Sequence, residues 1–193
     1  MVSPKNKKIG AKLIEVIGKG IKVERVFDES KENFVDILFS KDSPESGVVS
    51  YSTIGVSDVE FKGDEGEPFP VGLEITSSFG EYDKAILDIL ADIYFYAMDH
   101  DEWICSPGSI LRDVVAKWIP GEDMQHAYFT APFYLDELGK VYEFPGKQVT
   151  WVMMIPISQK EYEYFLEHGD EKFEEFLQEK DVSFLELHRA SSI

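Results

Sequence analysis

Residues 148–157 constrain the fold of this chain more than any other segment. They read QVTWVMMIPI and are apolar at almost every position, so neither side of the segment suits contact with water. Short runs of this kind, rich in β-branched and aromatic residues, form strands that are covered on both faces, usually in the middle of a sheet. The sequence therefore predicts a central strand with other layers packed above and below it.

The rest of the chain supplies partners for this strand. Apolar and charged residues alternate over 21–27, and 34–39 and 47–56 are two further strand candidates. The turn signals that separate the three segments predict an antiparallel meander. Further strands are expected over 71–79, 124–133 and 182–187. Apolar residues at helical spacing predict helices over 8–19, 82–98, 159–167 and 170–179. The predicted fold class is α+β, a mixed and largely antiparallel β-sheet sandwiched by helices.

The charge balance limits the partners of the protein. Nineteen Lys and Arg oppose 37 Asp and Glu, which gives a formal net charge of −18. Such a surface repels nucleic acid and anionic membranes and attracts cationic proteins, although acidity also serves plain solubility. No segment approaches the roughly 20 apolar residues that cross a bilayer. The N-terminus lacks a signal-peptide pattern, and Cys105 is a lone cysteine, so we expect a cytoplasmic protein.

Catalytic motifs are not apparent. Cys105 has no basic neighbour in sequence that would favour its thiolate, which suits a buried structural cysteine. The four histidines are scattered singly, and the carboxylates near His100 are not spaced as ligands of one metal. Neither a nucleophile elbow nor a phosphate-binding glycine loop occurs. We therefore expect no enzymatic activity, no metal and no cofactor; a hydrolase that uses His126 with acidic partners remains an alternative.

Several short motifs from residue 71 onward occur in an order that resembles the suppressor-of-fused (SUFU) family. They are VGLEITSSF with its acidic Glu74, the helix over 82–98, the turn Trp103-Ile104-Cys105-Ser106-Pro107-Gly108, the pair Gln125-His126, the strand VTWVMMIPIS before a Glu-rich helix, and the closing Arg189-Ala190-Ser191. The resemblance implies one domain over 1–193, strongest over 71–193, without catalytic activity.

The same resemblance suggests a function. Bacterial single-domain members of the family resemble immunity proteins encoded beside secreted toxins of the LXG type, some of which end in nucleases. Animal members clamp a peptide with the help of an acidic residue in the turn after the cysteine. Here that turn reads Pro107-Gly108-Ser109, so the peptide-binding function is not carried over.

We therefore expect an immunity protein that binds and neutralises a cognate toxin, with a basic nuclease domain as the natural partner. The alternative is a peptide-binding adaptor that uses a free strand edge and is unrelated to toxins. Acidic residues are densest over 161–181, which is either the solvent face of two helices or a docking surface. Partner contacts are predicted, from expected exposure alone, at Glu81, Asp83, Asp99, Asp101, Glu171, Glu174 and Glu175.

Overall fold

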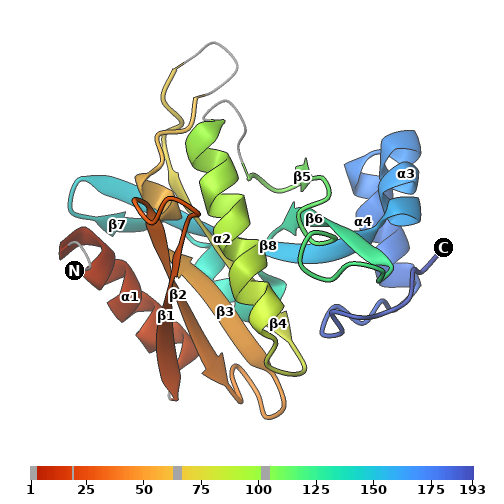
Figure 1. Cartoon of the computed structure of the whole chain (residues 1–193), viewed down its shortest axis with the longest axis horizontal. Helices are drawn as coiled ribbons and strands as arrows, with labels where there is room; N and C mark the ends of the chain where they lie inside the picture. The colour runs from red at the N-terminus through yellow and green to blue at the C-terminus, as the bar shows by residue number, and fades with distance from the viewer. Residues whose placement is uncertain (1–3, 19, 63–66, 101–104) are drawn as a thin grey trace.

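The computed structural model describes residues 4–18, 20–62, 67–100 and 105–193. Figure 1 shows a twisted sheet with helices against both of its faces. The elements in chain order are α1 (Pro4–Ile17), β1 (Ile21–Phe27), β2 (Phe34–Lys41), β3 (Val49–Ile54), η1 (Val56–Asp58), β4 (Gly72–Phe79), α2 (Lys84–Asp99), β5 (Ile110–Leu111), β6 (Met124–Thr130), η2 (Phe133–Gly139), β7 (Tyr142–Phe144), β8 (Lys147–Ser158), α3 (Gln159–His168) and α4 (Asp170–Glu179).

The strands form a sheet in the order β1-β2-β3-β4-β8-β6-β5, with β7 paired to the start of β8. β1 to β3 form the predicted antiparallel meander, and β4 extends it by pairing antiparallel to β3. β4 and β8 then run parallel, with Gly72 opposite Val149, whereas β6 and β7 pair antiparallel to β8. The predicted α+β class with a mixed, largely antiparallel sheet is confirmed, and the apolar run 148–157 is its central strand.

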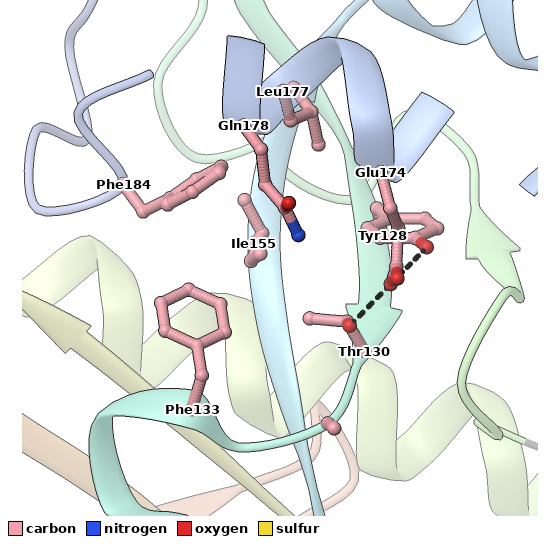
Figure 2. Close-up of a pocket in the computed structure, with 9 residues that line it drawn as sticks. Tyr128, Thr130, Phe133, Ile155, Glu174, Leu177, Gln178 and Phe184 are labelled. Carbon is pink, nitrogen blue, oxygen red and sulfur yellow. Dashed lines mark hydrogen bonds between the residues drawn. The ribbon is translucent and has the colours of Figure 1, made fainter. Parts of the chain in front are cut away.

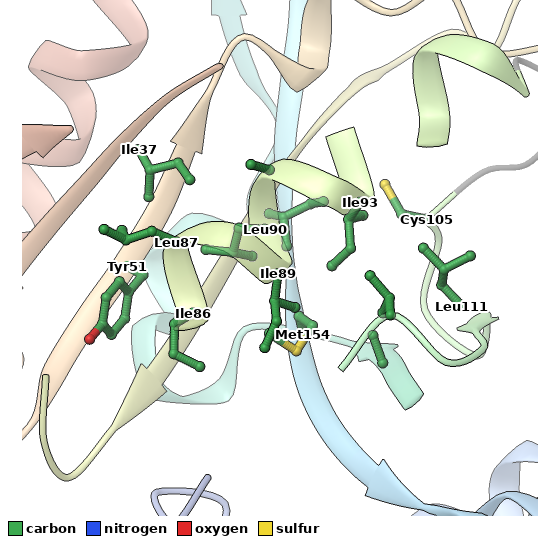
Figure 3. Packing of buried hydrophobic residues seen from close by; sticks show 14 of the residues in the cluster. Ile37, Tyr51, Ile86, Leu87, Ile89, Leu90, Ile93, Cys105, Leu111 and Met154 are labelled. Atoms are coloured by element: carbon green, nitrogen blue, oxygen red, sulfur yellow. The ribbon is translucent and has the colours of Figure 1, made fainter. Parts of the chain in front are cut away.

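Alternate residues of β8 enter different cores. Val152 and Met154 face α2, whose apolar stripe includes Ile89 and Leu90, in the largest buried cluster (Figure 3). Their neighbours Trp151 and Ile155 face the other side of the sheet. Because successive residues of a strand point to opposite faces, a strand covered on both sides must be apolar throughout.

Two separate covers share the second face of the sheet. One consists of α1 and η2, which pack around Trp151. The other consists of α3 and α4, which pack around Tyr128 and Ile155. Figure 1 shows α1 in red at one end of the molecule and α3 and α4 in blue at the other. The two covers therefore meet along a boundary on this face of the sheet, and the candidate site lies at that boundary.

The strand predicted over 182–187 is wrong. The chain makes turns there instead, and its apolar side chains divide between two clusters. Phe184 packs beside α4, while Leu187 belongs to the core under α2. The backbone of this segment meets the end of β4 through the hydrogen bond from Gly80 N to Leu185 O at 2.7 Å. Apolar alternation here reflects a segment that crosses the end of the sheet rather than a paired strand.

The end of the chain is fixed by a buried ion pair. Arg189 Nη1 and Nη2 donate to the two carboxylate oxygens of Glu161 at 2.6 and 2.8 Å, and Nη2 also donates to Pro156 O. Glu161 belongs to the predicted capping box, in which its side chain accepts from the N-cap residue Ser158. The Ser158 and Ser191 hydroxyls lie 2.8 Å apart. The closing Arg-x-Ser motif therefore anchors the C-terminus to the start of α3.

Candidate functional site

The predicted partner contacts on α2 lie at its two ends. Asp83 is the N-cap of the helix and accepts a hydrogen bond from Ala85 N, and its other oxygen lies 3.2 Å from His188 Nε2. Glu81 is exposed beside it, whereas Asp99 is exposed in the last turn. A helix of this length places its ends about 22 Å apart, so these acids cannot contact one small surface together. Asp101 lies outside the described residues.

The other three predicted contacts lie on α4. Glu171 and Glu175 are exposed, and Glu174 is half-buried against the sheet. Residues 159–181 contain nine acids and three lysines, so α3 and α4 carry a strong excess of negative charge. The structure brings Glu171, Glu174 and Glu175 together and separates them from the acids of α2.

A groove lies at the boundary between α4 and η2. Figure 2 shows its walls: Phe133 from η2 and Phe184 from the C-terminal segment on one side, and Glu174 of α4 on the other. Ile155 of β8 forms the floor, and Leu177 of α4 lies above it. The groove has a volume of about 330 Å³. It is apolar along most of its length and carries a carboxylate at one side.

A hydrogen-bond network holds that carboxylate. The Tyr128 hydroxyl lies 2.6 Å from Asp170 Oδ1 and 3.0 Å from Glu174 Oε1. The Thr130 hydroxyl donates to the same Glu174 oxygen at 2.6 Å. Burial and then the hydrogen bond to Asp170 raise the pKa of Tyr128, so this phenol remains a donor at neutral pH. Both donors come from β6, which therefore orients the acid side of the groove.

Of the predicted partner contacts that the structure describes, Glu174 alone lines this groove, and the other lining residues were not predicted. Tyr128 and Thr130 come from β6. Phe133 was predicted at the end of a strand over 124–133, but β6 ends at Thr130 and Phe133 begins a 3₁₀ helix, while Phe184 comes from another segment wrongly predicted as a strand. These residues meet only through the pairing of β6 with β8 and the crossing of the C-terminal segment. One signal was present in the sequence, because Phe133 directly follows Pro132, and a proline favours the end of a strand.

The two residues considered for catalysis, His126 and Cys105, are both buried in surroundings that suit a structural role. His126 is fully buried; its Nδ1 accepts from Asp113 N at 2.9 Å, and its Nε2 lies 2.9 Å from Gln159 Oε1. Both ring nitrogens are therefore occupied, with the proton placed on Nε2. Burial raises the pKa of the Cys105 thiol to about 12, which keeps it protonated at neutral pH. Within the described ranges, no group of three or more His, Cys, Asp or Glu side chains is arranged to hold a metal ion.

Solved structures share this architecture and define its class, a helix-covered mixed sheet of the suppressor of fused type. A SUFU homologue from Neisseria gonorrhoeae FA 1090 superposes with a TM-score of 0.74 at 17% identity, covering 98% of this chain and 97% of that one. The structure of a Sufu–Fu complex matches with a TM-score of 0.65 at 13% identity, over 91% of this chain and 84% of that one.

The family follows from sequence. The model of the suppressor of fused protein (SUFU) family matches residues 31–190, so the chain belongs to this family. It is also 30% identical over 192 residues to "Immunity protein YqcF" of Bacillus subtilis (strain 168), covering 100% of this chain and 99% of that protein. These names describe an immunity protein and suppressor of fused proteins rather than enzymes. No helix in the described part of the chain is long and apolar enough to span a membrane.

Proposed function

We propose that this protein is an immunity protein that binds a cognate toxin and thereby neutralises it. The observation that carries the proposal is the similarity to Immunity protein YqcF, which extends over the whole of both chains. The acidic surface of α3 and α4 supports it, because complementary charge accelerates the association of two proteins and favours the correct partner. On this proposal the protein works by contact alone, without a cofactor, in the cytoplasm.

The chemistry of the toxin is proposed from charge. A nuclease must attract a phosphate backbone and therefore has a basic active-site surface. A partner with net charge −18 would be attracted to such a surface from a distance. A nuclease domain of the LXG type, which the family resemblance suggests, fits both requirements.

Co-expression tests this function directly. The toxin domain encoded by the gene next to this one should be lethal alone and tolerated with the immunity protein, and the two should purify as a stoichiometric complex. Persistent toxicity together with the lack of a complex would contradict the proposal.

Kinetics then test the acidic surface. Glu171→Lys with Glu175→Lys should slow association by about tenfold at low salt, because steering depends on local charge. Glu29→Lys with Glu32→Lys, two exposed acids beyond β1 at the far end of the sheet, is the matched control and should change the rate less. Equal effects of the two pairs would mean that only total charge matters.

A strand-edge adaptor is the second candidate, and one observation favours it. β1 is the end strand of the sheet, and Val23 and Phe27 on it are 54% and 50% exposed. A peptide could add to this edge through main-chain hydrogen bonds. Its affinity would survive high salt, whereas the association rate of an electrostatically steered toxin should fall as salt rises.

A further inference from the structure

Glu174 has an incomplete set of partners for a carboxylate in an apolar groove. Both of its hydroxyl donors, from Tyr128 and Thr130, reach the same oxygen, Oε1. Within the described part of the chain, neither Glu174 nor Asp170 has a lysine or arginine within ion-pair distance, and no donor reaches Glu174 Oε2. A half-buried carboxylate is stabilised by a positive charge, because burial weakens its hydration.

The Tyr128 hydroxyl cannot donate to both of the carboxylates that lie beside it. It lies within hydrogen-bond distance of both Asp170 and Glu174, which are one helical turn apart on α4. A phenol carries a single proton, so it donates to only one carboxylate at a time. Two carboxylates thus share one donor, and like charges at this distance repel each other. Asp170 is exposed and does not line the groove, so a cation in the groove would act at Glu174.

The shape of the groove indicates what carries the cation. Its volume of about 330 Å³ is many times the roughly 10–15 Å³ that a single water needs, which is ample for one long side chain. Ile155 and Leu177 suit an aliphatic stem, and Phe133 and Phe184 lie with their ring centroids 5.5 Å apart at the entrance side. A planar guanidinium at the end of such a stem pairs with a carboxylate through two N–H groups.

We propose that this groove receives an arginine side chain of the partner protein, with its guanidinium at Glu174 and its stem over Ile155. The inference deepens the proposed function, because the partner is the cognate toxin. The proposal places the contact at Glu174, on the side of α4 that lines the groove. Attraction between surface charges alone would not distinguish Glu174 from the other acids of that helix. A buried arginine anchor of this kind is a common centre of binding energy in protein interfaces.

A conservative pair of variants tests the groove in the toxin complex. Glu174→Gln keeps the acceptor for Tyr128 and Thr130 but removes the charge, and Glu175→Gln removes the same charge from an exposed neighbour. The dissociation constant for the toxin domain should rise about tenfold or more with Glu174→Gln, since bonds to charged groups are the stronger ones, and stay within about twofold with Glu175→Gln. Phe133→Ala should weaken binding without loss of the fold, because this ring is 48% exposed.

The outcomes separate the two proposals. Tight wild-type binding with equal, small effects of Glu174→Gln and Glu175→Gln would overturn the arginine groove and leave the immunity function intact. If the toxin domain does not bind the wild type, the function is wrong, and the groove is tested alone with blocked Gly-Arg-Gly and Gly-citrulline-Gly peptides. Saturable shifts of the Ile155 and Leu177 methyl resonances by the arginine peptide only would support the groove. Equal shifts with both peptides, or none, would overturn it.

Discussion

The Glu74 carboxylate is fully buried and accepts five hydrogen bonds, and Lys147 Nζ donates to one of its donors, the Ser57 hydroxyl, at 2.7 Å. Thr53 and Ser57 hydroxyls donate to the carboxylate at 2.6 Å each, and the backbone N–H groups of Gly55, Val56 and Ser57 donate at 2.9 to 3.3 Å. These donors form the turn from β3 into η1. The acidic residue that sequence analysis associated with the family therefore organises a turn, and its role is structural.

Glu74→Gln should lower the free energy of unfolding by about 2–3 kcal/mol. The amide nitrogen of glutamine cannot accept the hydrogen bonds that a carboxylate oxygen accepts at this position. Urea unfolding followed by circular dichroism measures the change. Glu60→Gln is the matched control, since it removes the same charge from an exposed residue close by in sequence, and its effect should stay within about 0.5 kcal/mol. Equal stability of the Glu74→Gln and Glu60→Gln proteins would contradict this role.

The ion pair of Glu161 with Arg189 predicts a dependence of stability on pH. Burial opposes ionisation of Glu161, but hydrogen bonds and the charge of Arg189 outweigh it and hold its pKa below the ordinary value of 4.5. A lowered pKa in the folded state stabilises the fold above the unfolded pKa, and this contribution is lost as the pH falls through the folded pKa.

Glu161→Gln should therefore cost about 3–5 kcal/mol near neutral pH, where it leaves Arg189 buried and unpaired. The difference from wild type should stay constant down to the ordinary value of 4.5 and shrink below it as Glu161 becomes protonated in the wild type. Urea titrations between neutral and acidic pH measure this difference. A difference that persists unchanged in acid would show that charge on Glu161 is not the cause.

Elements with a regular apolar period were predictable from the sequence, whereas elements defined by their contacts were not. The meander, the central strand and α2 each follow a period of two or of 3.6, or are apolar throughout. η2 and β7 have no such period: η2 is kinked at Leu135, and β7 contains three residues. The segment 182–187 does alternate, but its side chains contact two cores. The acids of α4 lie on a helix with a regular apolar period, so their exposure could be predicted. The aromatic wall opposite them is formed by contacts between distant segments, which the sequence pattern does not show.

The anchoring of the C-terminal segment to α3 is testable through Ser158. Its hydroxyl accepts from Glu161 N and contacts Ser191, so it caps the helix and holds the last residues at once. Ser158→Ala should cost about 1–2 kcal/mol, and amide exchange should accelerate in the first turn of α3 and in residues 189–193 together. Ser183→Ala, in an exposed part of the same segment, is the control. Faster exchange in α3 alone would mean that the tail is held independently.

The net charge of −18 acts on the stability of the whole molecule as well as on its partners. Acids are distributed along the entire chain and outnumber bases by 37 to 19, so the compact state concentrates repulsion that unfolding relieves. Salt shortens the range of this repulsion, from about 30 Å at 0.01 M to about 10 Å at 0.1 M. The melting temperature should therefore rise with added NaCl, by about 2–4 °C for each kcal/mol of repulsion removed.

Charge substitutions give this prediction its sharpest test. Glu171→Lys with Glu175→Lys makes the net charge less negative by two units per substitution, so the melting temperature should depend less steeply on NaCl than in the wild type. Lys172→Arg, on an exposed side chain of the same helix, leaves the charge unchanged and should reproduce the wild-type slope. The ion pairs of the surface, such as Lys84 with Asp88 at 2.8 Å, have the opposite salt dependence, because screening weakens attraction as well. A melting temperature that falls with salt would mean that the attraction in these ion pairs outweighs the repulsion among the acids. The surplus carboxylates would then be placed far enough apart in the folded protein to repel one another little.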